Sequence, residues 1–93
     1  MYATVRRYAN HPELAAELSG RAEEVRQLIS GISGFVGYYL IQSGHDTVSV
    51  SVFQDESGAQ QSNEVAKGWI AENLPALALD PPEVFAGDVV ISG

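Results

Sequence analysis

The chain has 93 residues and no cysteine, and its twelve acidic and five basic side chains give a formal net charge of −7. This length fits one domain, residues 1–93, and the lack of thiols excludes disulfides, thiolate catalysis and cysteine-based metal centres. The negative charge disfavours nucleic acid and anionic membranes as partners. No run approaches the roughly 20 apolar residues of a membrane span, and residues 1–10 contain no hydrophobic run of the kind found in signal peptides. We therefore expect a cytoplasmic protein.

The first half of the chain predicts a strand, a helix and a β-hairpin. Residues 1–8 are rich in aromatic and β-branched side chains, which are typical of a strand. Pro12 suits the first position of a helix, and apolar residues recur from there at helical spacing as far as residue 30. Residues 35–42 and 47–53 are expected to pair across a short loop. The expected partners are Ile41 with Val48, Tyr39 with Val50, and Gly37 with Val52.

The second half predicts one more helix and a last strand. Asp55 is expected to cap a helix that runs to about residue 73, and residues 83–91 predict a strand. The resulting order, β-α-β-β-α-β, is that of ferredoxin-like α+β domains. Right-handed crossovers then place both helices on one face of a four-stranded antiparallel sheet and leave the other face bare.

The strand at residues 35–42 is apolar on both faces, which predicts a homodimer. Phe35, Tyr39 and Ile41 are expected to face the helices. The opposite set would form an exposed apolar patch, and such patches mark interaction surfaces. Two such sheets packed face to face would cover each other with two-fold symmetry. The alternative is that these side chains are simply tolerated at the surface. The expected interface consists of Val36, Tyr38, Leu40 and Phe53.

Nearly the whole chain resembles the dimeric α/β-barrel superfamily, and within it uncharacterised bacterial members related to antibiotic biosynthesis monooxygenase domains. The run GFVGYY at Gly34–Tyr39 and the junction SVFQD at Ser51–Asp55 carry the similarity. The resemblance implies a homodimer with a pocket between sheet and helices in each subunit. Some relatives oxygenate aromatic polyketides or quinols without metal or flavin, through the substrate's own carbanion. Others bind haem, isomerise lactones or have no demonstrated activity, so the fold does not identify the reaction.

Four residues are candidate ligand contacts. Cofactor-free oxygenases of this type use a Trp and an Asn of the second helix near the aromatic substrate, which the resemblance transfers to Trp69 and Asn63. Their six-residue spacing puts them on opposite shoulders of the helix, so a packing anchor and a buried amide remain the competing interpretation. Tyr39 could hydrogen-bond a ligand carbonyl or satisfy its hydroxyl within the core. Phe35 is expected beside it in the same pocket.

The remaining polar candidates predict no metal site. His11 and His45 lack a partner at i, i+4 and a carboxylate cluster, so both are expected to be exposed turn residues. No histidine lies in the second helix, where haem ligation would require one. Arg6 and Arg7 point to opposite faces of the first strand. One of them approaches the buried region, where it holds a substrate oxyanion or pairs with a carboxylate.

Two functions follow from these residues and the resemblance. The first is a cofactor-independent monooxygenase-like enzyme that acts on a small aromatic or quinol-type substrate. The alternative is a non-catalytic dimeric module that binds a small apolar metabolite. Neither hypothesis requires a cofactor, and whether the chain is an enzyme at all stays open.

Overall fold

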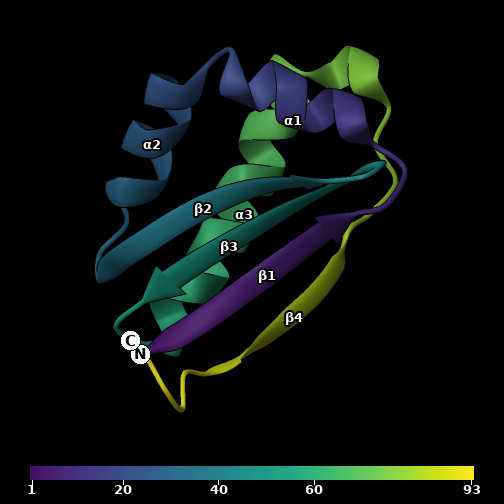
Figure 1. Cartoon of the computed structure of the whole chain (residues 1–93). Coiled ribbons are helices and arrows are strands. Elements are labelled where there is room, and N and C mark those ends of the chain that lie inside the picture. Colours follow the sequence, from purple (N-terminus) through teal and green to yellow (C-terminus); the bar gives the residue numbers. More distant parts are fainter.

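The computed structural model describes residues 1–93 as an antiparallel sheet with helices on one side (Figure 1). The sheet order is β2-β3-β1-β4, with every neighbouring pair antiparallel. This confirms the predicted ferredoxin-like α+β fold. None of the helices is long and apolar enough to cross a bilayer. The elements in chain order are β1 (Tyr2–Tyr8), α1 (Pro12–Ser19), α2 (Ala22–Ser30), β2 (Phe35–Ser43), β3 (Asp46–Phe53), α3 (Glu56–Asn73), the 3-10 helix Pro75–Leu77 and β4 (Glu83–Asp88).

The single helix predicted over residues 12–30 is wrong, because the structure has two helices there. α1 ends at Ser19, just before Gly20, and α2 begins at Ala22 and runs in a different direction (Figure 1). Glycine is a poor helix former, so the chain bends there at low cost. The bend lets Leu14 of α1 and Ile29 of α2 enter two different clusters of the core.

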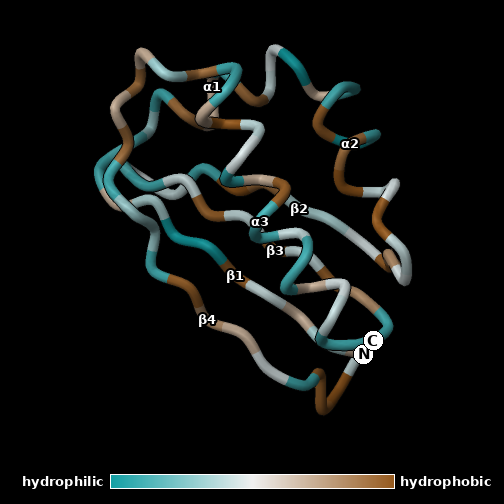
Figure 2. Tube along the Cα trace, turned by 180° about the vertical axis from the view of Figure 1, so that it is seen from behind, coloured by the Kyte–Doolittle hydropathy of each residue, from teal (hydrophilic) through white to brown (hydrophobic).

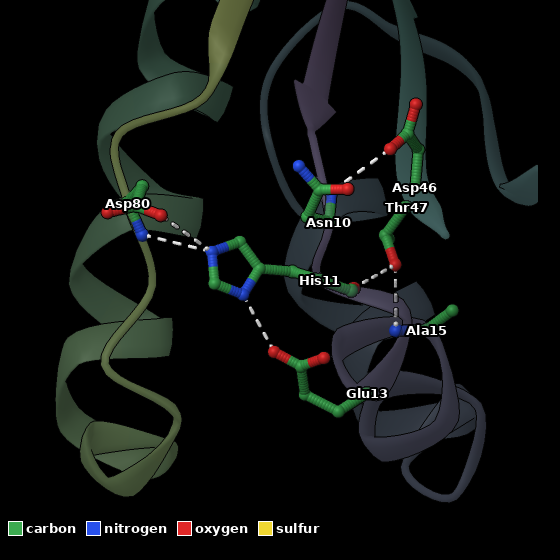
Figure 3. Close-up of polar contacts among 7 residues, drawn as sticks. All are labelled: Asn10, His11, Glu13, Ala15, Asp46, Thr47 and Asp80. Carbon is green, nitrogen blue, oxygen red and sulfur yellow. Dashed lines mark hydrogen bonds and ion pairs between the residues drawn. The ribbon is translucent and has the colours of Figure 1, made fainter. Parts of the chain in front are cut away.

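The start of α1 is held by a side chain from the sheet. His11 makes no side-chain cap to the helix. Instead, the buried Thr47 hydroxyl of β3 donates to the carbonyl oxygen of His11 at 2.8 Å and accepts the N–H of Ala15 at 3.1 Å (Figure 3). Free N–H groups at a helix start need such an acceptor. α3 starts as predicted, with the Asp55 carboxylate accepting the N–H of Gly58 at 3.2 Å.

The core consists of two small apolar clusters beneath the helices. One contains Tyr8, Leu14, Leu18 and Val25, and the other contains Ile29, Ile32, Phe53 and Ala59. Only 17 of the 93 residues are buried, so the packing that holds this chain is limited.

The hairpin pairs as predicted, but it turns the opposite face toward the helices. The side chains of Tyr38 and Leu40 pack on the core, and Phe53 is fully buried within it. The predicted interface is therefore wrong for these three residues, which the chain's own helices cover. Val36, the fourth, is exposed. The observed partners are Ile41 with Val48, Tyr39 with Val50, and Gly37 with Val52.

Two local features explain why the faces are reversed. The pairing register shifts between Phe35 and Gly37, so regular alternation fails there, and Phe35 packs on the same core as Tyr38. In addition, the helix-facing residues of β3 include two serines that a sequence pattern assigns to solvent. Ser49 and Ser51 are buried instead.

The uncovered side of the sheet carries an apolar surface, which we call the open apolar face. Tyr39 is 65% exposed and Phe85 60% exposed on this side. Val5 lies between them in the sheet, since it pairs with both Val50 and Phe85. Figure 2 shows the hydrophobic stretch of β4 at the edge of the sheet. The face comprises Val5, Tyr39, Ile41, Val48, Val50, Val52 and Phe85.

Two glycines of α3 are expected to respond to alanine in opposite directions. At Gly58 a Cβ would lie 2.9 Å from Cδ1 of Phe53 and 3.0 Å from the carbonyl oxygen of Ser33. Gly58→Ala is expected to lower the free energy of unfolding by about 1–3 kcal/mol through overpacking. Gly68 has open space around it, so Gly68→Ala is expected to raise that energy by about 0.5–1 kcal/mol. Urea denaturation followed by circular dichroism measures both. Equal effects would contradict the close approach at Gly58.

Candidate functional site

A cleft of about 460 Å³ lies beside α3 and under the segment of residues 74–82. This volume suits a small organic molecule. β1 contributes Arg6 and Tyr8 to its lining, and α3 contributes Asn63. Its apolar lining includes Ile70, Leu74, Leu79 and Val84.

The segment over the cleft is shaped by its prolines. Pro75 begins a single 3-10 turn, and Ala78 then takes a left-handed conformation with φ of +49°. Pro81 and Pro82 follow before β4 begins. Proline cannot continue a helix, so the chain crosses from α3 to β4 in an irregular path. That path leaves the space that forms the cleft.

Arg6 and Asn63 form the centre of the polar part of the lining. Nη1 of Arg6 donates to Oδ1 of Asn63 at 2.7 Å, and the Thr4 hydroxyl donates to the same oxygen at 3.3 Å. These two bonds fix which way the amide faces. Both hydrogen bonds of the Asn63 side chain are made by its oxygen, so the NH₂ group remains available as a donor.

Arg6 is a buried cation without a counter-ion. It is 5% exposed, and no carboxylate lies within ion-pair distance of its guanidinium group. Its Nε is buried and has no hydrogen-bond partner. Buried charges are normally paired, because removing them from water is costly.

The sheet beneath Arg6 is polar as well. Ser49 lies opposite Arg6 in the register, and Ser51 lies opposite Thr4. The hydroxyl oxygens of Ser49 and Ser51 are both buried and have no partner in the chain. Such groups are uncommon in protein interiors. Neither serine lines the cleft.

Two tyrosines lie near the Arg6 charge. Burial raises the pKa of the Tyr8 and Tyr38 hydroxyls, and the nearby Arg6 guanidinium opposes part of that rise. Both hydroxyls therefore stay protonated at neutral pH and can donate hydrogen bonds. Tyr8 lines the cleft, while Tyr38 lines a much smaller hollow of about 20 Å³ between α2, α3 and the sheet.

The structure does not bring the four predicted ligand contacts together. Only Asn63 lines the cleft. Tyr39 lies on the open apolar face, so the prediction that it faces the helices is wrong. Phe35 packs edge-to-face on Phe53, with ring centroids 6.0 Å apart, and lines neither the cleft nor the small hollow.

Trp69 holds α3 against α2. Its Nε1–H donates to Oε2 of Glu24 at 3.1 Å, and the Arg21 guanidinium lies 5.5 Å from the centroid of the indole ring. The side chain borders the small hollow and not the cleft. These contacts are those of the packing anchor, the competing interpretation of the sequence.

Sequence reasoning left the role of the two arginines open, and the structure separates them. Arg6 faces the helices and lines the cleft, whereas Arg7 lies on the opposite side of β1. Arg7 pairs with Asp46 at 2.9 Å and with Glu83 at 3.5 Å. Tyr8 was not among the candidates. Arg6 and Tyr8 are two residues apart on a strand and therefore lie on the same face, so an Arg6 that faces the helices would have predicted that Tyr8 does too.

His11 ties the segment over the cleft to the start of α1. Its Nδ1 lies 2.7 Å from Oε1 of Glu13, and its Nε2 lies 3.2 Å from Oδ2 of Asp80, which also lines the cleft (Figure 3). The side chain is 14% exposed, so the expectation of an exposed turn residue is wrong for His11. His45 is exposed at the β2–β3 turn, as expected.

The tie through His11 is expected to weaken as pH rises. Hydrogen bonding to Glu13, and then to Asp80, raises the pKa of the imidazole above its usual value. A raised pKa in the folded state contributes stability below about pH 6.5 and loses it as pH rises through the higher folded value. His11→Gln should therefore lower the melting temperature more at about pH 5.5 than at about pH 8.5. His45→Gln is the control for loss of an imidazole. A larger loss at high pH would contradict the ion pairs.

Neither a protein-family model nor a curated protein matches the sequence. Solved structures do match over nearly the whole chain. NE2512 from Nitrosomonas europaea, of unknown function, has a TM-score of 0.74 and 21% identity, covering 99% of this chain and 91% of that chain. SnoaB from Streptomyces nogalater, a cofactor-independent oxygenase, has a TM-score of 0.65 and 18% identity, covering 98% and 94%.

A MhuD mutant with two manganese protoporphyrin IX molecules per active site also matches, with a TM-score of 0.72, 14% identity, and coverage of 100% and 98%. In this chain the cleft lining contains no histidine or cysteine, so it lacks the axial ligands that most haem proteins use. At these identities the similarity shows the fold alone. The chain has the fold of the antibiotic biosynthesis monooxygenase-like proteins, as its sequence resemblance predicted.

Proposed function

We propose that this chain, with its monooxygenase-like fold, is a cofactor-independent oxygenase that acts on a small aromatic or quinol-type molecule in the cleft. The observation that carries the proposal is the pairing of Arg6 with Asn63 at the polar part of an otherwise apolar cleft. Small-molecule sites have this composition, with a few convergent polar groups among apolar walls. The description of SnoaB as a cofactor-independent oxygenase supports the reaction class.

The proposed reaction needs only the substrate and oxygen. In an anthrone, the ring CH₂ across the central ring from the carbonyl loses a proton, and the carbanion shares its charge with the carbonyl oxygen. The carbanion adds to O₂ to form a C–O bond, and the peroxide takes the proton back. The resulting hydroperoxide loses water, so that CH₂ and O₂ become C=O and H₂O. The free NH₂ of Asn63 and the Tyr8 hydroxyl would donate to the carbonyl oxygen as its negative charge develops.

Oxygen consumption with a panel of anthrones and quinols tests the proposal. We expect uptake of one O₂ for each product molecule, without added metal or flavin. Asn63→Ala should lower kcat/KM about 100-fold, the usual cost of losing one donor to a developing oxyanion. Asn73→Ala is the control, because Asn73 bonds the carbonyl of Trp69 and lies outside the cleft lining. If the protein consumes oxygen with no member of the panel, the proposal is overturned.

A second candidate function is a non-catalytic module that binds a small apolar metabolite. It is favoured by the position of Trp69, whose indole N–H is engaged by Glu24 and does not reach the cleft. Native mass spectrometry of freshly purified protein would show a co-purified ligand. That result, together with no oxygen uptake, would favour this candidate.

The proposed active form is a homodimer that joins two open apolar faces. The homodimer is the one that the sequence predicted, but its proposed interface is the open apolar face instead of the predicted residues. Tyr39, Ile41 and Phe85 are the large exposed side chains on this face. A contiguous apolar surface of this kind marks a contact between proteins, and a sheet face can pack on its own symmetry copy.

A further inference from the structure

We propose that the ligand of the cleft is an organic anion, a ring system whose negatively charged oxygen binds Arg6. The inference rests on the proposed function, since it names the chemical class of molecule that the same cleft takes. It goes further because the charge is present when the molecule binds, and is not created only during a reaction.

The first support is the state of the Arg6 side chain. Arg6 is buried, its Nη1 bonds a neutral amide oxygen, and its Nε has no partner. Its other close neighbours are neutral hydroxyls of Tyr8 and Tyr38, which keep their protons. A buried guanidinium group surrounded by neutral groups needs an anion, and an organic oxyanion offers the matching acceptor.

The second support is the distribution of charge along the lining. The other charged residues of the cleft are Glu64, Lys67 and Asp80. Glu64 and Lys67 are exposed, and Asp80 is engaged by His11. Arg6 is therefore the one buried charge among the residues that line the cleft.

The third support is the apolar remainder of the lining. Ile70, Leu74, Leu79 and Val84 offer no hydrogen-bonding side chain. A fully polar anion such as phosphate would leave these apolar side chains in contact with water, so they would contribute nothing to its binding. A hydrophobic ring with one ionised oxygen satisfies both parts, with the oxygen at Arg6 and the ring against the aliphatic side chains.

Isothermal titration calorimetry under nitrogen tests the inference with paired probes. 2-Naphthoate is compared with 2-naphthamide, which has the same ring and no charge. We expect the acid to bind at least about tenfold more tightly, as for other hydrogen bonds to charged groups. 4-Nitrophenolate compared with 4-nitroanisole at about pH 8 shows whether a phenolate oxygen serves as well as a carboxylate.

Variants of the two neighbouring arginines locate the effect. Arg6→Gln should remove the preference for the acid and leave amide binding within about threefold. Arg7→Gln is the matched control, because Arg7 lies on the other side of the strand and pairs with Asp46 and Glu83. It should keep the full preference. If Arg6→Gln does not fold, the comparison of the paired probes on the unaltered protein still decides.

Equal affinity for acid and amide, an equal loss in Arg7→Gln, or no binding by either anion would overturn the inference. The outcome is separable from that of the proposed function. Preference for the anion without oxygen uptake supports the inference and counts against the oxygenase. Oxygen uptake with neutral substrates and no preference for anions supports the oxygenase and counts against the inference.

Discussion

Tyr39→Asp is expected to convert the proposed homodimer to a monomer. Tyr39 lies on the open apolar face and is 65% exposed in one chain. In a two-fold interface each substitution occurs twice, so the change buries two unpaired carboxylates between the sheets. An unpaired buried charge costs several kcal/mol, which is a large share of the binding energy of a small interface. Multi-angle light scattering should give the 10.0 kDa mass of one chain instead of twice that value.

Gln61→Asp is the control for added charge, because Gln61 is exposed on α3, on the helical side of the sheet. It should leave the mass at that of the dimer. If the unaltered protein already has the mass of one chain at micromolar concentration, the proposed interface is wrong. A dimer that persists in Tyr39→Asp would place the interface on another surface.

Phe53→Ala is expected to lower the free energy of unfolding by about 3–5 kcal/mol, the usual cost of removing a buried aromatic ring. Phe53 is fully buried, and it contacts Phe35 edge-to-face and closely approaches Gly58. A domain of this size has about 5–15 kcal/mol in total, so the variant should be largely unfolded at moderate urea. Denaturation followed by far-UV circular dichroism measures the loss.

The same experiment separates a core residue from an interface residue. If Phe53 served the dimer, as its sequence pattern predicted, the loss would fade as protein concentration rises and binding restores the contact. A core residue gives the same loss at every concentration. Val90→Ala is the control, because Val90 is 90% exposed and its truncation should change stability by less than about 0.5 kcal/mol.

The order of elements and the hairpin register could be predicted because each depends on local signals. Alternating apolar residues, the cap at Asp55 and the short loop at Gly44 agree with one another, and the structure follows all three. The break at Gly20 was missed because the apolar spacing continues across it. Helical spacing records which side of a helix is apolar, and it does not record whether the axis bends.

The faces of the sheet could not be predicted from polarity. Sequence patterns assume that buried residues are apolar, and β3 violates this with Ser49 and Ser51. The same exception left the site undecided, because the sequence places one of Arg6 and Arg7 near the buried region without indicating which. Polar residues in the interior are tolerated where a protein uses them, so pattern-based prediction fails most often at functional sites.

The hydrophobic interior is divided into two clusters, and buried polar residues of β1 and β3 lie in the same layer. The cluster around Leu14 and the cluster around Phe53 are separate, and Arg6 and Ser49 are buried in the same layer. A molecule bound in the cleft would therefore add apolar contacts to this small interior and stabilise the folded chain. Binding to the folded state alone raises the melting temperature, by an amount that grows with the logarithm of the ligand concentration divided by Kd. Thermal-shift screening of ring-bearing acids thus offers a direct route to the natural ligand.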